Sequence, residues 1–363
     1  MIDAKCFTTE WIEQKSKELK CPDKNLIEKV IRAFSLLDML ASSGCPFYFK
    51  GGSCLMLILQ GTAHRLSIDI DILCPPGTNI EEYLKQYAEN GFLEYKLIER
   101  KQSGNDIPKS HTKLFYQIEY LADSNKISYI LLDVVYDECH YKQTQKFLID
   151  NVMIECVGER HTVAVPSISD ILGDKLTAFA PETTGIPYFK KDKLATLEII
   201  KQLYDIGRLF DKVDDLAISS SVFKELVPVE LGYRGLSLTI SDVCEDIRKT
   251  ALNISTRGYV DGEKFKLLQQ GIKSISSFIF SGAYRIENAI IDAAKAAYLA
   301  TAIENGENTL EHYSGFPLSV ANMQITHLPS RLNRLKIGNP EAFFYWAKTD
   351  ALFNTLWSKL GNR

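Results

Sequence analysis

The sequence lacks long hydrophobic runs, since no stretch approaches the roughly 20 consecutive apolar residues that span a bilayer. Its first residues, Met-Ile-Asp-Ala-Lys-Cys, also lack the basic segment and apolar stretch of a secretory signal. We therefore expect a cytoplasmic protein with no membrane partner.

An excess of either charge is also missing. The 42 Lys and Arg residues nearly balance the 46 Asp and Glu residues, which gives a net charge of -4. This balance excludes wholesale coating of nucleic acid, so any RNA contact must come from local basic patches.

The eight cysteines include no C-x-x-C pair, which indicates reduced, mostly buried thiols.

The chain has enough apolar residues for more than one core. With 363 residues, of which 45% are hydrophobic, two domains are expected. The pattern before Ser167 mixes α and β, and it is helical afterwards, so we expect domains at residues 1–166 and 167–363. In the first domain, helices are predicted at residues 25–41, 55–59 and 80–88, and strands at 47–49, 67–73, 92–99, 113–120 and 127–136. In the second domain, helices are predicted at residues 169–180, 193–211, 242–253, 265–280, 285–305 and 340–360.

Two carboxylates on one strand form the strongest chemical signal. Residues 67–73 alternate strictly, so Asp69 and Asp71 project from one face and Ile70 and Ile72 from the other. Such carboxylates repel each other unless cations neutralise them, and Mg²⁺ prefers carboxylate and phosphate oxygens. A solvated strand face is the alternative for an isolated D-x-D pattern.

A glycine turn precedes these carboxylates. Gly51 and Gly52 follow a predicted strand and precede a helix, so backbone amides and the Ser53 hydroxyl are suited to a phosphate. The motif is not a P-loop, because no Gly-Lys-Ser or Gly-Lys-Thr follows at the required spacing.

Two charged residues interrupt apolar patterns. Asp133 lies within a hydrophobic strand, which is costly unless the charge is paired or metal-bound. We interpret it as a third metal ligand, with a capping or lysine-paired carboxylate as the alternative. Lys175 projects from the apolar arc of its helix, either inward toward a triphosphate or with its stem packed and its ammonium reaching water.

Two further features carry weaker signals. Asp205 shares a helix side with Lys201, four residues earlier, which by itself indicates a solvated ion pair. The segment around Lys190 and Lys191 combines aromatic and basic residues suited to a nucleotide. A solvated basic loop has the same composition.

Taken together and in order, these motifs resemble the AbiEii/AbiGii toxin family of nucleotidyltransferases, within the DNA polymerase beta-like superfamily. The resemblance covers about residues 25–212. It is carried by Gly52-Ser53, Arg65-x-Ser67-x-Asp69-x-Asp71, Asp133, Asp174-Lys175-Leu176-x-Ala178 and Tyr204-Asp205-Ile206.

The resemblance implies an α+β fold, in which a mixed β-sheet flanked by helices precedes an all-helical C-terminal domain. It implies use of a nucleoside triphosphate (NTP) with two Mg²⁺ ions. It further implies transfer of a nucleotide to the 3′ end of tRNA by the toxin of a toxin–antitoxin pair, with a cognate antitoxin as partner.

The resemblance also assigns roles by position. Asp69 and Asp71 would hold the metals, together with Asp133. Lys175 and Asp205 would act on the triphosphate and beside the acceptor, so that helices within residues 169–211 complete the active site. Gly52 and Ser53 would hold phosphate; with Arg65 from the motif and Lys190 and Lys191 from the basic segment, they form the expected nucleotide-binding set.

Other functions fit the same residues. A nucleotidyltransferase of this kind can act on a small molecule or on a protein side chain instead of RNA. A catalytically silent binding module with the same fold is the third possibility, because fold alone does not prove chemistry.

Overall fold

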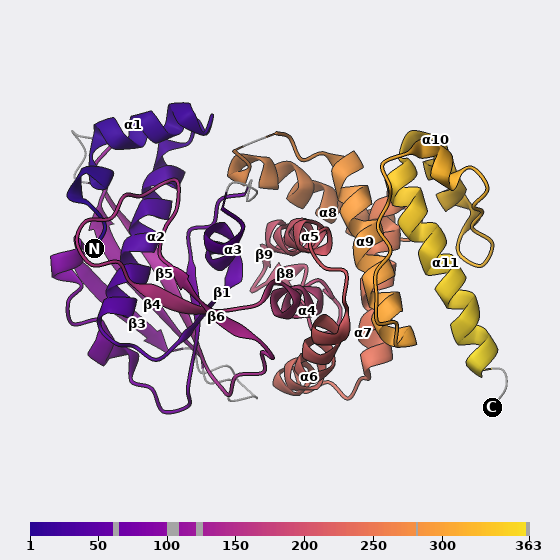
Figure 1. Cartoon of the computed structure of the whole chain (residues 1–363), viewed down its shortest axis with the longest axis horizontal. Coiled ribbons are helices and arrows are strands. Elements are labelled where there is room, and N and C mark those ends of the chain that lie inside the picture. The colour runs from indigo at the N-terminus through magenta and orange to yellow at the C-terminus, as the bar shows by residue number, and fades with distance from the viewer. Residues whose placement is uncertain (61–64, 100–108, 121–125, 281, 361–363) are drawn as a thin grey trace. The chain divides into compact units, whose positions relative to one another are not determined.

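The structure is a computed structural model of the chain, and it describes residues 1–60, 65–99, 109–120, 126–280 and 282–360. The chain forms two compact units (Figure 1). The first comprises Met1–Ser167 and Ser277–Ala283, and the second comprises Ile168–Ser276 and Tyr284–Arg363. None of the described helices is long and apolar enough to cross a membrane.

A seven-stranded mixed sheet forms the centre of the first unit, with strand order β3-β4-β5-β2-β1-β7-β6. The β2–β5 and β1–β7 pairs are parallel and the others are antiparallel. This confirms the expected mixed sheet and α+β class. The strands are β1 (Tyr48–Lys50), β2 (Ile70–Cys74), β3 (Glu94–Glu99), β4 (Lys109–Gln117), β5 (Ile127–Tyr136), β6 (Thr144–Leu148) and β7 (Thr162–Pro166).

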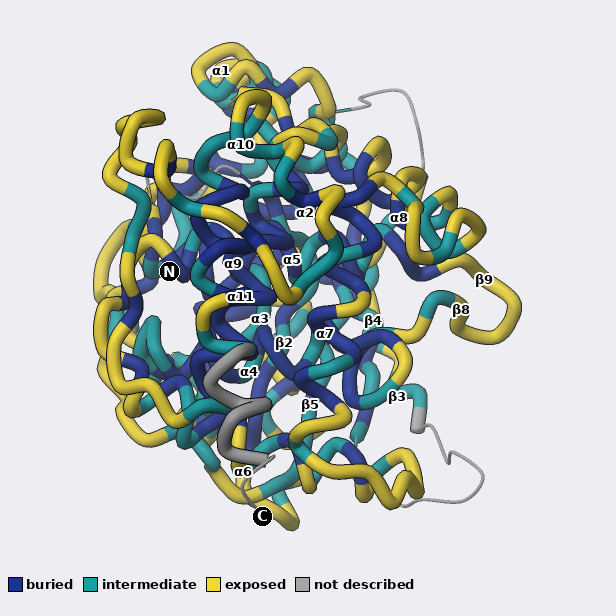
Figure 2. The backbone as a smooth tube through the Cα atoms, turned by 90° about the vertical axis from the view of Figure 1, so that its right-hand side faces the viewer, coloured by how far each residue is buried: buried dark blue, intermediate teal, exposed yellow. Residues whose placement is uncertain are grey.

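The central strands bury one face and leave the other partly exposed. Alternate residues such as Ile72 and Val134 are about 1% exposed, as the two-residue period of a strand dictates. Helix α2 (Lys24–Ser42) contacts this buried face, where the Arg32 guanidinium lies 5.0 Å from the Tyr116 ring centre. Figure 2 shows α2 and β2 as largely buried tube. The site residues project from the opposite, partly exposed face.

Other helices of the first unit are short. Among its described residues they include α1 (Thr9–Glu18), α3 (Gly51–Leu59) and 3₁₀ helices at Ala4–Phe7, Ile80–Tyr83 and Ala88–Asn90. The predicted helix over residues 80–88 is therefore wrong. Ile80 and Leu84 are buried, whereas Glu81, Glu82 and Lys85 are exposed, so the segment has two apolar anchors and no continuous stripe.

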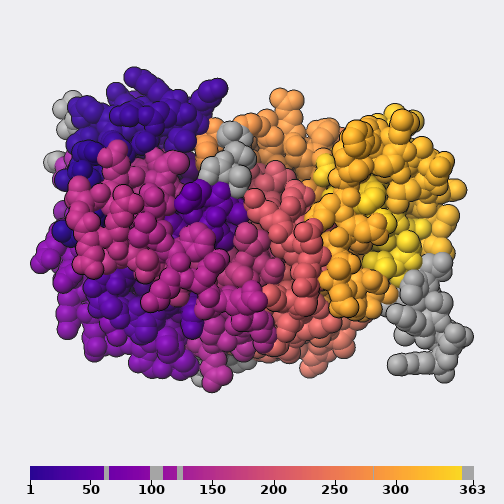
Figure 3. All heavy atoms as spheres, in the orientation of Figure 1, coloured from indigo at the N-terminus to yellow at the C-terminus, as the bar shows by residue number. Residues whose placement is uncertain are grey.

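The second unit is helical apart from one small hairpin. Its central helix, α9, contacts α5, α7 and α11 and carries many buried alanines, which permit close helix approach. In Figure 3 the orange and yellow atoms of this unit lie together. The elements are α4 (Ile168–Ala178), β8 (Phe189–Lys190), β9 (Lys193–Leu194), α5 (Thr196–Phe210), α6 (Ala217–Tyr233), α7 (Ile240–Ser255), α8 (Gly262–Ser274), α9 (Ile286–Asn305), α10 (Leu335–Gly338) and α11 (Pro340–Leu360), with 3₁₀ helices at Ile275–Phe278, Pro317–Val320 and Ser330–Arg334.

A buried polar cluster fixes α5 against α9. The Asp292 carboxylate lies 3.0 Å from an Arg208 nitrogen and accepts a hydrogen bond of 2.9 Å from the Tyr284 hydroxyl. Burial raises the pKa of both Asp292 and Tyr284. A Cβ atom added to Gly207 would lie 2.0 Å from Asp292 Oδ1, so only glycine admits this carboxylate. The cluster thereby sets the position of α5 and of the residues it carries.

Two predicted helices have different bounds. The helix predicted over residues 193–211 begins at Thr196, because Lys193 and Leu194 pair with Phe189 and Lys190. The helix predicted over residues 265–280 gives way to a 3₁₀ turn after Ser274.

All eight cysteines lie within the described residues; six are buried and none is disulfide-bonded.

Candidate functional site

Four charged or polar residues stand in register across adjacent strands of the sheet. Lys50 on β1 pairs with Asp71 on β2, Asp71 pairs with Asp133 on β5, and Asp133 pairs with His111 on β4. Paired residues project from the same face of a sheet, and neighbouring strands lie about 4.8 Å apart. We call Lys50, Asp71, Asp133 and His111 the polar row. Asp133 therefore lies on a strand adjacent to the one that carries Asp71.

The polar row meets the start of α3. Lys50 is the residue before this helix, and no side chain caps the helix N-terminus. Gly51 has a φ of +77°, and a Cβ atom there would lie 2.0 Å from Asp71 Oδ2. The carboxylate of Asp71 therefore packs directly on the backbone at the helix start. Unbonded amides at such a terminus favour an anionic group.

Gly52 makes room for two side chains at the same place. A Cβ atom on Gly52 would lie 2.7 Å from an Arg65 guanidinium nitrogen and 2.6 Å from Ser67 Oγ. Arg65 is buried and also donates to the Leu66 carbonyl over 3.1 Å. The α3 N-terminus thus combines backbone amides with a guanidinium, both of which suit a phosphate.

Ser53 has a positioning role in this structure. It is 1% exposed, and its hydroxyl donates a hydrogen bond of 2.5 Å to the backbone carbonyl of Asp69. Asp69 itself lies just before β2, since that strand begins at Ile70 rather than at residue 67. The hydroxyl predicted to hold phosphate therefore fixes the segment that carries the first carboxylate.

A segment from late in the chain joins this region. The amide of Leu66 donates to the carbonyl of Phe278 over 2.8 Å, and Arg65 forms an isolated β-bridge with Ile279. Both contacts lie within the first unit. They fix the backbone of the segment that leads to Asp69 and Asp71.

The carboxylates fit Mg²⁺ in their chemistry. Asp71 and Asp133 are partly exposed, project from one face, and offer the oxygen donors that Mg²⁺ prefers. Among the described residues, no three His, Cys, Asp or Glu side chains are gathered as a formed metal-binding group. Asp71 packs on Gly51, and Asp133 contacts His111 through Oδ1.

His111 and Lys50 are site residues that the sequence patterns did not reveal. The Nδ1 atom of His111 contacts Oδ1 of Asp133, and both side chains are partly exposed. The predicted strand began at residue 113, so His111 fell outside it, whereas β4 begins at Lys109. The alternative interpretation paired Asp133 with a lysine, whereas its partner in the structure is His111.

The close approach at Gly51 gives a testable result. Gly51→Ala is expected to destabilise the first unit by about 1 to 3 kcal/mol, because alanine is strained at positive φ and its Cβ displaces Asp71. Gly44 is a matched control, since its φ is +76° and a Cβ there meets nothing within 4 Å. Urea unfolding should show a larger loss for Gly51→Ala than for Gly44→Ala. Equal losses would mean that the contact with Asp71 is unimportant.

In the second unit, Lys175 and Asp205 form a buried ion pair. Lys175 Nζ lies 3.0 Å from Asp205 Oδ2 and donates a hydrogen bond of 3.0 Å to Gln202 Oε1. The side chains are only 9% and 4% exposed. The pair joins α4 to α5.

This pairing corrects two interpretations from the sequence. Lys175 does not reach water with its ammonium, because that group is buried against Asp205. A solvated ion pair does not describe Asp205, because its side chain is 4% exposed and lies 3.0 Å from Lys175. A buried ion pair is costly to desolvate and adds little net stability compared with apolar residues.

Lys190 and Lys191 lie on the exposed β8–β9 hairpin. Lys190 pairs with Lys193, and Phe189 pairs with Leu194. The two turn residues, Lys191 and Asp192, have φ values of +48° and +64°, as a two-residue type I′ turn requires. Figure 2 shows the hairpin as an exposed loop. It presents three lysines and a half-exposed aromatic ring.

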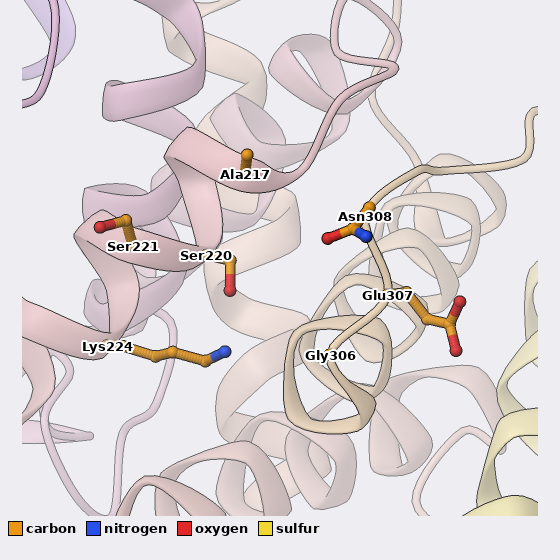
Figure 4. A pocket seen from close by; sticks show the side chains of 7 residues that line it. All are labelled: Ala217, Ser220, Ser221, Lys224, Gly306, Glu307 and Asn308. Carbon is orange, nitrogen blue, oxygen red and sulfur yellow. The ribbon is translucent and has the colours of Figure 1, made fainter.

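A separate cavity of about 260 Å³ lies in the second unit, between α6 and the turn that follows α9. Figure 4 shows the Lys224 side chain extending toward the turn at Gly306. Gly306 caps the C-terminus of α9, where a nearby cation is favourable. None of the lining residues belongs to the candidate site. They are Ala217, Ser220, Ser221, Lys224, Gly306, Glu307 and Asn308.

Comparisons with known proteins bear on this geometry. The family model described as nucleotidyl transferase AbiEii toxin, type IV toxin–antitoxin system, matches residues 35–274. Two solved structures from Helicobacter pylori are similar. One is JHP933, with 14% identity, coverage of 77% of this chain and 90% of that chain, and a TM-score of 0.38. The other, a proposed nucleotidyltransferase, has 16% identity, coverage of 79% and 97%, and a TM-score of 0.39. No curated protein sequence matches the chain.

Proposed function

Since the chain belongs to the AbiEii family of nucleotidyl transferase toxins, we propose that it transfers a nucleoside monophosphate from an NTP to the 3′ end of tRNA. An acceptor hydroxyl oxygen forms a new bond to the α-phosphorus, and the bond from that phosphorus to the bridging oxygen of the β-phosphate breaks. Pyrophosphate leaves with the electron pair, and the hydroxyl proton passes to a base or to water.

The in-register carboxylates at the start of α3 carry this proposal. We assign Asp69, Asp71 and Asp133 as the residues that hold two Mg²⁺ ions, because they are oxygen donors on or beside adjacent parallel strands. When bound, such ions activate the attacking oxygen and stabilise the leaving pyrophosphate. The residues of the chain position these groups and the nucleotide.

The triphosphate is assigned to the N-terminus of α3. Amides from Gly52 onward and the guanidinium of Arg65 provide positive charge there, and Gly52 leaves space for that guanidinium. Ser53 orders the backbone of Asp69. We further propose that Lys175 binds the triphosphate and that Asp205 orients both this lysine and the acceptor, because the two are paired in a buried environment.

The exposed hairpin supports a polyanionic acceptor. Its lysines can contact phosphates and Phe189 can stack on a base, which is how proteins bind single-stranded RNA ends. Because family membership implies nucleotidyl transfer within a toxin–antitoxin system, we propose that tRNA modification is the toxic activity and that a cognate antitoxin counteracts it.

Replacing Lys190 and Lys191 together by alanine is expected to weaken tRNA binding. Each lost phosphate contact should lower the slope of log affinity against log salt by about 1. Stability should change by less than about 0.5 kcal/mol, because both side chains are exposed. Lys249→Ala, an exposed lysine on α7, is the control. Unchanged salt dependence in the double variant would remove the hairpin from the acceptor site.

The acceptor is tested by incubating the protein with Mg²⁺ and each labelled NTP in turn. Total tRNA, other RNA, an aminoglycoside and the protein itself serve as separate acceptors. The proposal is supported if the label enters tRNA and is lost after a treatment that removes the 3′-terminal nucleotides of the tRNA. Label only in the small molecule or the protein would replace tRNA as acceptor. Absence of label and of pyrophosphate in every reaction would favour a silent binding module.

A further inference from the structure

His111, like Lys50, is a member of the polar row to which the family resemblance assigns no role. We infer that His111 is a positioning residue, which holds the carboxylate of Asp133 for metal binding. This inference rests on the proposed function, because it concerns the same metal site. It adds a residue on β4 to a site otherwise built from β2, β5 and the start of α3.

The strand order defines what His111 touches. Asp133 on β5 has Asp71 as its partner on β2 and His111 as its partner on β4. The histidine therefore stands on the side of Asp133 opposite to Asp71. Its Nδ1 atom contacts only one carboxylate oxygen, Oδ1. A carboxylate has two oxygens with about four acceptor positions, so this contact leaves acceptor capacity for a cation.

A purely stabilising role explains the contact poorly. The side chains of His111 and Asp133 are 21% and 30% exposed, and pairs that are open to solvent contribute little to stability. Restricting the rotamers of a metal-binding carboxylate has a larger effect on metal affinity than such a solvent-exposed pair has on stability. Groups that hydrogen-bond to metal ligands typically contribute 10- to 100-fold to metal affinity.

His111 is assigned as a positioning residue and not as a ligand. Mg²⁺ prefers oxygen donors and binds few side chains directly. The imidazole nitrogen that faces the site is already occupied by its contact with Asp133. Its function is therefore exerted through the carboxylate.

A matched pair of substitutions tests the inference. In His111→Asn, the amide nitrogen is bonded to Cγ, as Nδ1 is in histidine, so the donor to Asp133 is kept. In His111→Gln, the amide lies one bond further out, so the donor is displaced while the residue stays polar. Both variants are expected to fold, and thermal unfolding checks this. His111→Leu, which has no donor, extends the series.

Mg²⁺ binding to the full chain is measured by calorimetry without NTP. The dissociation constant is expected to rise about 10- to 100-fold in His111→Gln and in His111→Leu, and to stay within about threefold of the wild-type value in His111→Asn. In transfer assays, the Mg²⁺ concentration for half-maximal rate should shift in the same order, with a smaller change in kcat at saturating Mg²⁺.

The outcomes separate this inference from the proposed function. If Asp133→Asn weakens Mg²⁺ binding but all three His111 variants bind like wild type, His111 has no positioning role and the metal assignment stands. If Asp71→Asn and Asp133→Asn both leave Mg²⁺ binding unchanged, the metal assignment fails and the role of His111 fails with it. Equal weakening in the Asn and Gln variants would also overturn the positioning role, because donor placement would not matter.

Discussion

Asp71→Asn is expected to lower the rate of nucleotidyl transfer on the order of 1,000-fold while leaving the fold intact. Metal ions that stabilise developing charge are worth several kcal/mol, and each ~1.4 kcal/mol corresponds to a tenfold change in rate. The amide keeps the shape of the carboxylate beside Gly51 but removes its charge. Without Mg²⁺, stability should be equal or slightly higher, because repulsion between neighbouring carboxylates is relieved.

Steady-state transfer assays and urea unfolding test this expectation together. Asp69→Asn should behave in the same way, because it removes the other carboxylate of the pair. Asp150→Asn provides the control, since Asp150 is an exposed acid of the same unit and lies 3.9 Å from its Arg160 partner. Turnover of Asp71→Asn at the wild-type rate would contradict the assignment of this residue as a metal ligand.

Lys175→Met is expected to destabilise the second unit by about 3 to 5 kcal/mol, because the substitution leaves a buried charge on Asp205 without its partner. From the sequence alone, stability is expected to change little or to improve, since methionine keeps the packing of the lysine stem. The 3.0 Å pair between α4 and α5 reverses that expectation. Urea unfolding of the purified variant measures the loss of stability. At urea concentrations at which the variant is still folded, its affinity for the triphosphate should be lower by about tenfold to hundredfold.

A double-mutant cycle separates stability from function. Asp205→Leu combined with Lys175→Met removes both charges, so much of the lost stability should return. Transfer activity should remain absent, because the residues proposed to bind the triphosphate and to orient the acceptor are both gone. If Lys175→Met unfolds at the wild-type urea concentration, the ammonium is not held in a desolvated pair. If the double variant is active, neither residue is needed for the reaction.

Local patterns were sufficient for the elements with strong periodicity. The strand over residues 127–136 and the helix around residues 25–41 have nearly the predicted bounds, because alternating or helically spaced apolar residues specify which face is buried. The strands at Thr144–Leu148 and Thr162–Pro166 were missed. Thr144–Leu148 is mostly exposed, so it lacks a clear apolar alternation.

The geometry of the site depends on contacts between distant residues. The pairing of Asp71 with Asp133 follows from strand register, which no local pattern specifies. His111 is preceded and followed by polar residues, so nothing in its neighbourhood indicated a strand. The pairing of Lys175 with Asp205 required the packing of α4 against α5. Sequence patterns therefore identified most of the acidic and basic candidates but not their partners.

Anomalous diffraction from crystals of the full chain, grown with Mn²⁺ in place of Mg²⁺ and a non-hydrolysable NTP analogue, tests the central claim most directly. The account predicts anomalous peaks at the carboxylates of Asp69, Asp71 and Asp133, and triphosphate oxygens at the N-terminus of α3. An analogue bound with its phosphates elsewhere, or with no anomalous peak at these three carboxylates, would contradict it.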